Sequence, residues 1–190
     1  MTGLDLLERS IGYTLGSLHL VTDDSLDAPT PCPAWSLRQL LEHMYDSLGS
    51  LAEAVEAGRV ALTPSYDAGA DPVAAVRSRA CRLLGVWAAT GVPDRTSVAG
   101  QPLATRIVAA TGALEIAVHG WDVAEACGAD RAIPDELAAE LLRFAPLLVT
   151  DEDRPYRFGP PARVAPSAAP GRRLLAFLGR TPHVYSPGQA

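Results

Sequence analysis

The chain has 190 residues, of which 48% are hydrophobic and 20% charged, and its formal net charge is −6 at pH 7. This length and composition are typical of a single globular domain that buries its core without disulfides. The negative charge disfavours nucleic acid as a partner, because an acidic surface repels a phosphate backbone.

The sequence also argues against membrane insertion and secretion. No apolar stretch approaches the roughly 18–20 residues of a membrane-spanning helix. The first ten residues, MTGLDLLERS, carry acidic side chains where a signal peptide has a basic region followed by an apolar core. The three cysteines, Cys32, Cys81 and Cys127, lie far apart and resemble neither a disulfide framework nor a Cys-rich zinc site. We therefore expect a cytoplasmic protein with no membrane partner.

Apolar residues at helical spacing predict five helices. The predicted segments are 3–21, 37–57, 72–91, 103–127 and 134–148. Ser36 is the expected N-cap of the second helix and Gly58 its C-cap, while Asp71 followed by Pro72 marks the start of the third. Residues 91–102 are expected to form a loop.

Four long amphipathic helices joined by moderate loops predict an all-α fold, a four-helix bundle over residues 1–150. Strand signals are too sparse for a substantial sheet. Residues 151–190 form a Pro-rich tail, with an extended segment at 157–164 and a short amphipathic helix at 172–180. Five of its side chains are too apolar for a solvated end, so we expect the tail to pack back on the bundle as part of the same domain. They are Phe158, Leu174, Leu175, Phe177 and Leu178.

A candidate metal site lies on two of the predicted helices. Glu115 and His119 stand four residues apart and share one helix face, where they form either a surface hydrogen bond or part of a metal site. Asp122, three residues further on, could orient the imidazole of His119 or anchor the loop that contains Trp35 through hydrogen bonds. His43, in the middle of the second helix, is either a histidine at the edge of the core or a second imidazole facing the interior. Two histidines and one glutamate form a donor set of catalytic zinc sites, which leave a fourth position open.

Two segments carry a resemblance to a known family. TPCPAWSLRQLLEHM (30–44) resembles the P-x-x-x-W-[ST]-[VL]-R-x-L-x-x-H signature of the mycothiol-dependent maleylpyruvate isomerase family. ALEIAVHGWDVAEACG (113–128) resembles its second signature, E-x-x-x-H-[GA]-W-D-[LVI]-A. The resemblance implies a DinB-like metal-binding four-helix bundle whose ligands here are His43, Glu115 and His119. Zinc is the expected ion, although nickel, iron and cobalt also suit these ligands.

The resemblance also implies a chemistry. The founding activity of the family uses a low-molecular-weight thiol, mycothiol, to isomerise a cis double bond, and relatives transfer the thiol to an electrophile. We therefore expect a metal-dependent isomerase or S-transferase whose partners are a small-molecule substrate and the thiol. Arg154 and Arg157 either bind a carboxylate of the thiol or substrate, or are solvated loop charges. The isomerase carries a separate C-terminal domain with no counterpart here, so we do not expect maleylpyruvate itself as the substrate.

Several alternatives stay open. The protein could be a thiol-independent metal enzyme, such as a hydrolase, lyase or tailoring enzyme, that acts through a metal-bound water. It could also be a non-catalytic metal-binding protein of the same fold. Because the thiol comes from the cofactor, we expect the three cysteines to be small buried hydrophobic residues. Trp35 either packs at the entry of the second helix or lines the pocket, and a homodimer formed through a helix face remains open.

Overall fold

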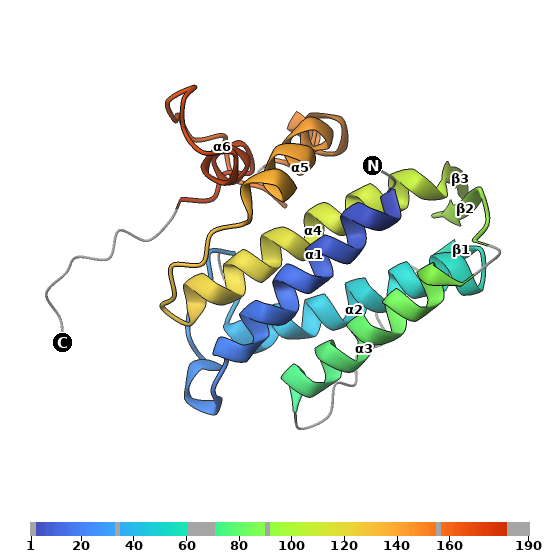
Figure 1. The fold of residues 1–190 in the computed structure, drawn as a ribbon, viewed down its shortest axis with the longest axis horizontal. Helices are drawn as coiled ribbons and strands as arrows, with labels where there is room; N and C mark the ends of the chain where they lie inside the picture. The colour runs from blue at the N-terminus through green and yellow to red at the C-terminus, as the bar shows by residue number, and fades with distance from the viewer. Residues whose placement is uncertain (1–2, 33–34, 61–70, 90–91, 155–156, 182–190) are drawn as a thin grey trace, which may run out of the picture.

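The computed structural model describes residues 3–32, 35–60, 71–89, 92–154 and 157–181. This part of the chain is mostly helical, with six α-helices and one small three-stranded sheet (Figure 1). The helices are α1 (Gly3–Ser17), α2 (Leu37–Glu56), α3 (Pro72–Ala88), α4 (Thr105–Ala126), α5 (Asp135–Leu148) and α6 (Pro170–Phe177). The strands are β1 (Arg59–Val60), β2 (Arg95–Val98) and β3 (Gln101–Ala104).

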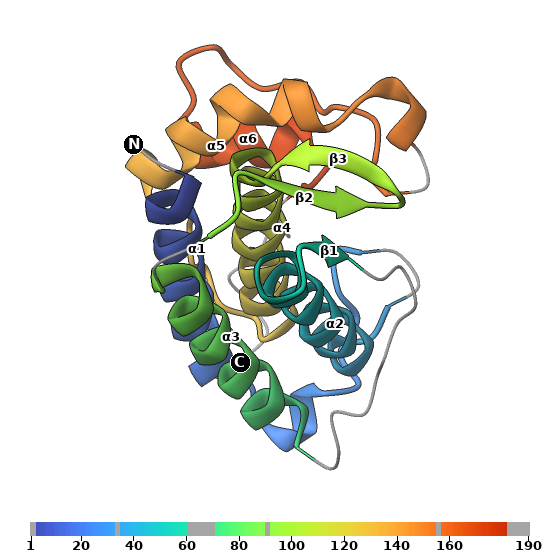
Figure 2. The same cartoon turned by 90° about the vertical axis from the view of Figure 1, so that its right-hand side faces the viewer.

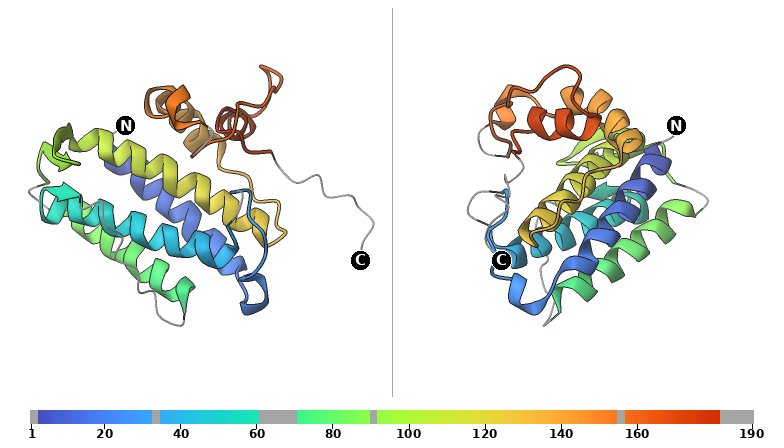
Figure 3. Two further views of the ribbon diagram at one scale, coloured as in Figure 1. Left: turned by 180° about the vertical axis from the view of Figure 1, so that it is seen from behind. Right: turned by 60° about the vertical axis from the view of Figure 1, so that its left-hand side comes forward.

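Helices α1 to α4 show bundle-like packing. α1 lies along α4, and α2 packs against both α3 and α4, as seen from two sides in Figures 1 and 3. At the contact between α1 and α4, the Thr14 hydroxyl donates to the carbonyl of Ile116 at 2.7 Å, and a Cβ at Gly120 would collide with Thr14. The missing side chain at Gly120 therefore lets the two helices approach closely.

The capping signals explain where α2 and α3 begin. The Ser36 hydroxyl accepts from the backbone N–H of Gln39, whose side-chain oxygen accepts from the N–H of Ser36 at 2.9 Å, a complete capping box. Asp71 accepts from the N–H of Ala74 at 2.9 Å, and Pro72 occupies the first turn of α3. Both predicted starts are confirmed, and the predicted helices α4 and α5 are confirmed to within two residues.

The prediction of a loop at 91–102 is wrong. β2 and β3 form an antiparallel hairpin there, and β1 adds to β2 in parallel, beside the ends of α2 and α4 (Figure 2). The turn contains Ala99 at φ 51° and Gly100 at φ 78°, so two successive left-handed residues reverse the chain. The strands are short, and Pro102 lies on the edge strand β3. For these reasons the alternation of apolar and polar residues that would predict strands is not visible in the sequence.

The predicted extent of two further segments also needs correction. α1 ends at Ser17 and continues as a 3-10 turn, rather than as an α-helix to residue 21. Residues 157–164 begin with a turn and a bend and contain no strand, and the N–H of Ala162 donates to the carbonyl of Ala176 in α6 at 2.8 Å. α6 packs on α5, and Leu174 of α6 and Leu178 directly after it are buried.

α4 is the central helix of the fold. Its length and composition would suit a membrane span, contrary to our expectation that the chain has no such stretch, yet 83% of its most apolar 18-residue window is buried inside the protein. A core helix of a globular protein has these same properties, and α4 places His119 and Asp122 in the interior and the partly exposed Glu115 at its edge.

Candidate metal centre

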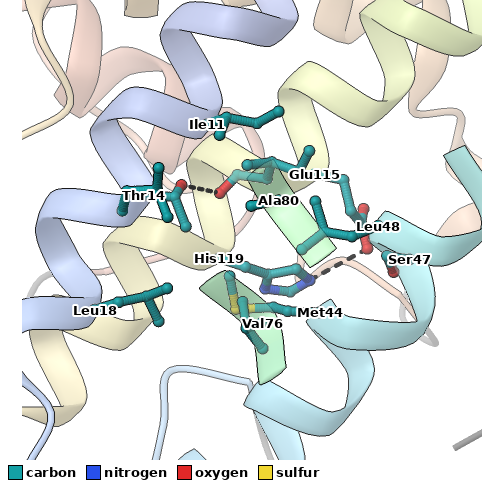
Figure 4. A pocket seen from close by; sticks show the side chains of 12 residues that line it. Ile11, Thr14, Leu18, Met44, Ser47, Leu48, Val76, Ala80, Glu115 and His119 are labelled. Atoms are coloured by element: carbon teal, nitrogen blue, oxygen red, sulfur yellow. Dashed lines mark hydrogen bonds and ion pairs between the residues drawn. The ribbon is translucent and has the colours of Figure 1, made fainter. Parts of the chain in front are cut away.

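α2 and α4 bring three side chains of the sequence prediction together. The Glu115 Oε1 atom lies 2.9 Å from His43 Nε2 and 3.2 Å from His119 Nε2. The three ligand atoms all lie within 4.8 Å of one another. Figure 4 shows the imidazole of His119 facing the carboxylate of Glu115, with Ser47 of α2 beside them.

The donor chemistry of this cluster fits a divalent metal. A tetrahedral zinc ion with ligands at about 2.0–2.1 Å separates any two ligand atoms by about 3.4 Å. The two nitrogen-to-oxygen distances are slightly shorter than that, because hydrogen bonds now join these atoms. An ion could replace those hydrogen bonds after only a small outward movement of the side chains.

The carboxylate of Glu115 is ionised. Burial raises its pKa, but hydrogen bonds and charge from His119 and His43 outweigh burial and hold the pKa well below its usual range. One oxygen of Glu115 therefore offers a negative charge to both imidazoles, as a metal ligand would.

The Nδ1 atom of His119 faces a buried carboxylate on the side away from Glu115. Asp122, fully buried, places Oδ2 2.9 Å from His119 Nδ1, where sequence spacing predicted an orienting carboxylate. Burial lowers the pKa of His119, but its hydrogen bonds with Asp122, Cys32 and Glu115 raise it well above 6.5. A proton on Nδ1 is thus fixed by Asp122, and Nε2 is directed toward His43 and Glu115.

Cys32, His119 and Asp122 form a second, fully buried group with metal-ligand spacing. Arg180 enters this group from the tail. Its Nη2 lies 3.0 Å from Cys32 Sγ and 3.2 Å from Asp122 Oδ2, and its Nε lies 3.3 Å from Asp122 Oδ1. Because a guanidinium already neutralises Asp122, we favour the cluster of His43, Glu115 and His119 as the metal centre.

The favoured cluster is partly exposed to solvent. The side chains of His43 and Glu115 are each 33% exposed, whereas that of His119 is 8% exposed. On the inner side, apolar residues such as Met44 and Val76 leave a cavity of about 10 Å³, room for one water molecule (Figure 4). A ligand larger than water would therefore approach from the outside.

Trp35 borders this approach. Its ring centroid lies 4.8 Å from that of His43 and 6.4 Å from that of His119. Of the two roles that the sequence left open, the structure thus places Trp35 beside the cluster, directly before the capping box that starts α2.

The prediction that all three cysteines are small buried hydrophobic residues is wrong. Cys81 is exposed because it lies outside the buried face of α3, and Cys127, the C-cap residue of α4, is partly exposed. Cys32 is buried, but its thiol donates to Asp122 Oδ2 at 3.3 Å and lies 4.0 Å from His119 Nδ1. The thiol is therefore a polar member of the network behind His119.

Arg154 and Arg157, the predicted thiol-binding residues, lie in the tail. Arg154 donates to the carbonyls of Gly159 and Phe177, the latter at 2.9 Å, and stabilises the tail itself. Arg157 is exposed and lies 3.8 Å from Asp153. None of these contacts brings either residue to the cluster, and their role in binding a thiol stays a prediction.

Arg180 is the functional residue that sequence reasoning missed. It is 6% exposed and pairs with Asp122 across 58 positions in the chain. The sequence around Arg180 shows an arginine directly after a glycine, at the end of an amphipathic segment. This pattern does not indicate that the side chain pairs with a remote carboxylate.

Residues 8–124 match the family described as the mycothiol maleylpyruvate isomerase N-terminal domain. The chain belongs to this family. The family match contains His43, Glu115, His119 and Asp122 and ends before α5 and α6.

Two relatives extend the similarity over most of the chain. They are uncharacterized proteins of Mycobacterium tuberculosis, Rv0738 of strain H37Rv and MT0763 of strain CDC 1551. Each is 31% identical over 175 residues, which cover 85% of this chain and 88% of the relative. No solved structure matches the chain.

Proposed function

We propose that the protein is a metal-dependent enzyme that uses a low-molecular-weight thiol, mycothiol, to isomerise or S-conjugate a small electrophile. The observation that carries this proposal is the convergence of the imidazoles of His43 and His119 on one carboxylate oxygen of Glu115, in a cluster that is partly exposed. Family membership supports it, since the family is described by a mycothiol-dependent isomerase. The proposal includes a DinB-like bundle, zinc as the ion and a cytoplasmic location.

Each residue of the cluster has a distinct part in this function. His43, Glu115 and His119 would hold the ion, and Asp122 would keep the imidazole of His119 in the orientation that binds it. When bound, the ion supplies a positive charge that lowers the pKa of a thiol or a water beside it.

The shape of the site supports a reaction on the outer face. The inner cavity of about 10 Å³ excludes a thiol or an organic substrate. Both reactants would therefore meet beside Trp35, His43 and Glu115. Trp35 presents a flat apolar ring at this point, which suits an unsaturated substrate better than a charged one.

Metal analysis of the purified protein tests the proposal first. We expect about one equivalent of zinc in the wild type and its loss in His43→Ala and His119→Ala. His19→Ala is the matched control, because His19 is exposed on the turn after α1 and lies 3.5 Å from Arg77. A wild type without metal, or full metal content in both ligand variants, would overturn the proposal.

An activity assay then separates the chemistries. Mycothiol consumption is followed with a panel of small electrophiles, including conjugated cis-alkenes. Turnover that requires both metal and added thiol supports the proposal. Turnover in the absence of any small thiol would instead favour the metal-bound-water enzyme.

A further inference from the structure

Arg180 connects the C-terminal tail to the candidate metal centre. Its side chain is 6% exposed and lies against the fully buried carboxylate of Asp122. The carboxylate receives both Nε and Nη2 of the guanidinium, one on each oxygen, at 3.3 and 3.2 Å. This two-point contact fixes the plane of the carboxylate, as a single hydrogen bond would not.

The end of α6 determines where Arg180 points. The N–H of Gly179 donates to the carbonyl of Ala176 at 3.1 Å, and that of Arg180 donates to the carbonyl of Leu175 at 2.8 Å, a Schellman motif. Gly179 has φ 72°, and a Cβ there would lie 2.5 Å from the backbone of Gly159. The backbone at Arg180 is therefore held in one position by α6 and by the segment that crosses it.

The contact continues from Asp122 to the imidazole. The same Oδ2 atom that receives Arg180 Nη2 lies 2.9 Å from His119 Nδ1. Nη2 also donates to Cys32 Sγ at 3.0 Å, so the loop before α2 is joined to the same point. A change in the position of Asp122 would turn the ring of His119 and move its Nε2 away from Glu115.

We propose that Arg180 is a positioning residue of the metal centre, which acts through Asp122 on His119, so that the tail completes a site whose ligands all lie in the bundle. The inference rests on the proposed function, because it requires that His43, Glu115 and His119 bind a metal.

Three variants test the inference. Arg180→Met removes the guanidinium, and Arg180→Lys keeps the charge but loses the two-point contact. Arg173→Gln is the matched control, since Arg173 is an exposed arginine of α6, the helix that ends just before Arg180. Zinc affinity is measured by competition with a chromophoric chelator, and the geometry of the site is followed by the visible spectrum of the cobalt-substituted protein.

We expect Arg180→Met to lower zinc affinity by about 10–100-fold and to change the cobalt spectrum, as loss of a residue that orients a ligand does. Arg180→Lys should lie between Arg180→Met and the wild type, and Arg173→Gln should match the wild type. In the metal-free protein, imidazole proton–nitrogen NMR spectra should show an altered His119 Nδ1–H signal in Arg180→Met.

A further pair of variants covers the case in which Arg180→Met does not fold. That variant leaves the buried carboxylate of Asp122 without its guanidinium partner, whereas Asp122→Asn combined with Arg180→Met removes both charges of the pair. If Arg180 acts through Asp122, removing it in the Asp122→Asn background should leave zinc affinity unchanged.

Two results would overturn the inference in distinguishable ways. Wild-type affinity and an unaltered cobalt spectrum in both Arg180→Met and Arg180→Lys would show that the tail only packs, and the proposed function would stand. A wild-type protein that binds neither zinc nor cobalt would overturn the inference and the proposed function together.

Discussion

The two nitrogens of His119 face opposite kinds of environment. On the Nε2 side, two imidazoles share one oxygen of Glu115, and two of the three side chains are partly exposed. On the Nδ1 side, Asp122 and Cys32 are buried, and Arg180 closes the group. Both sides place a carboxylate against the ring, yet among the residues that the structure describes a guanidinium is hydrogen-bonded only to the carboxylate of the buried side.

This difference follows from the cost of burying charge. A carboxylate that is removed from water must be paired, and Asp122 is paired with Arg180. Glu115 keeps contact with solvent, from which a metal ion could come, and its neighbours are two side chains that bind metals when neutral. The buried side is thus built for stability and orientation, and the open side for exchange with solution.

Asp122→Ala should have the largest effect on stability. It leaves the guanidinium of Arg180 buried without a partner, which is expected to lower the free energy of unfolding by about 3–5 kcal/mol. His43→Ala, on the open side, should lower it by less than about 1 kcal/mol. Urea unfolding of the two metal-free variants measures this difference. Equal losses in the free energy of unfolding would contradict the distinction between a stabilising buried side and an open side.

Zinc affinity should depend more on His43 than on Asp122, which is the reverse of the order expected for stability. His43→Ala removes a ligand and should reduce zinc affinity by more than about 100-fold, beyond the 10–100-fold expected when an orienting residue is lost. Isothermal titration with zinc measures this. A His43→Ala protein that binds zinc more tightly than Asp122→Asn would place the metal on the buried side, with Cys32 as a ligand.

Zinc binding should weaken as the pH falls. In the metal-free protein the pKa of His119 lies well above 6.5, so at neutral pH the imidazole carries a proton on Nε2 that zinc must displace. Displacement of one proton gives a rise in apparent affinity of about tenfold per pH unit, up to the pKa of His119. Titrations at several pH values in a non-coordinating buffer measure the slope, and an affinity independent of pH would contradict this protonation state.

Cys32→Ser should have the smallest effect. A serine hydroxyl can accept from Arg180 and donate to Asp122 as the thiol does, so we expect a change in the free energy of unfolding below about 1 kcal/mol. Zinc content and thiol-dependent turnover should also be retained. If turnover alone were lost, with fold and metal intact, Cys32 itself would supply the nucleophile.

Much of the helical layout could be predicted because its signals are local. Ser36 with Gln39, and Asp71 with Pro72, satisfy the first turns of α2 and α3 from within a few residues. Glu115 and His119 share a helix face by spacing alone, and the resemblance favoured the metal-ligand role of the two that the sequence left open for His43. The hairpin of β2 and β3 was missed because its two strands have four residues each and depend on each other.

The network behind His119 could not be predicted because it joins remote segments. Cys32 looked like a small hydrophobic residue between prolines, and its polar role depends on Arg180, 148 residues away. Arg180 in turn reaches Asp122 only because the Schellman motif at Gly179 and the packing of α6 direct it there. Neither helical period nor motif spacing carries information about such a contact.

The position of Arg180 in the chain has a consequence for protein synthesis. Translation proceeds from the N-terminus, so His43, Glu115 and His119 leave the ribosome well before residue 180 does. A chain that ends between residues 151 and 179 would contain every residue that faces the metal but not the guanidinium that neutralises Asp122. If Arg180 has the proposed role, a chain that ends before residue 180 therefore binds the metal less tightly than a chain that contains Arg180.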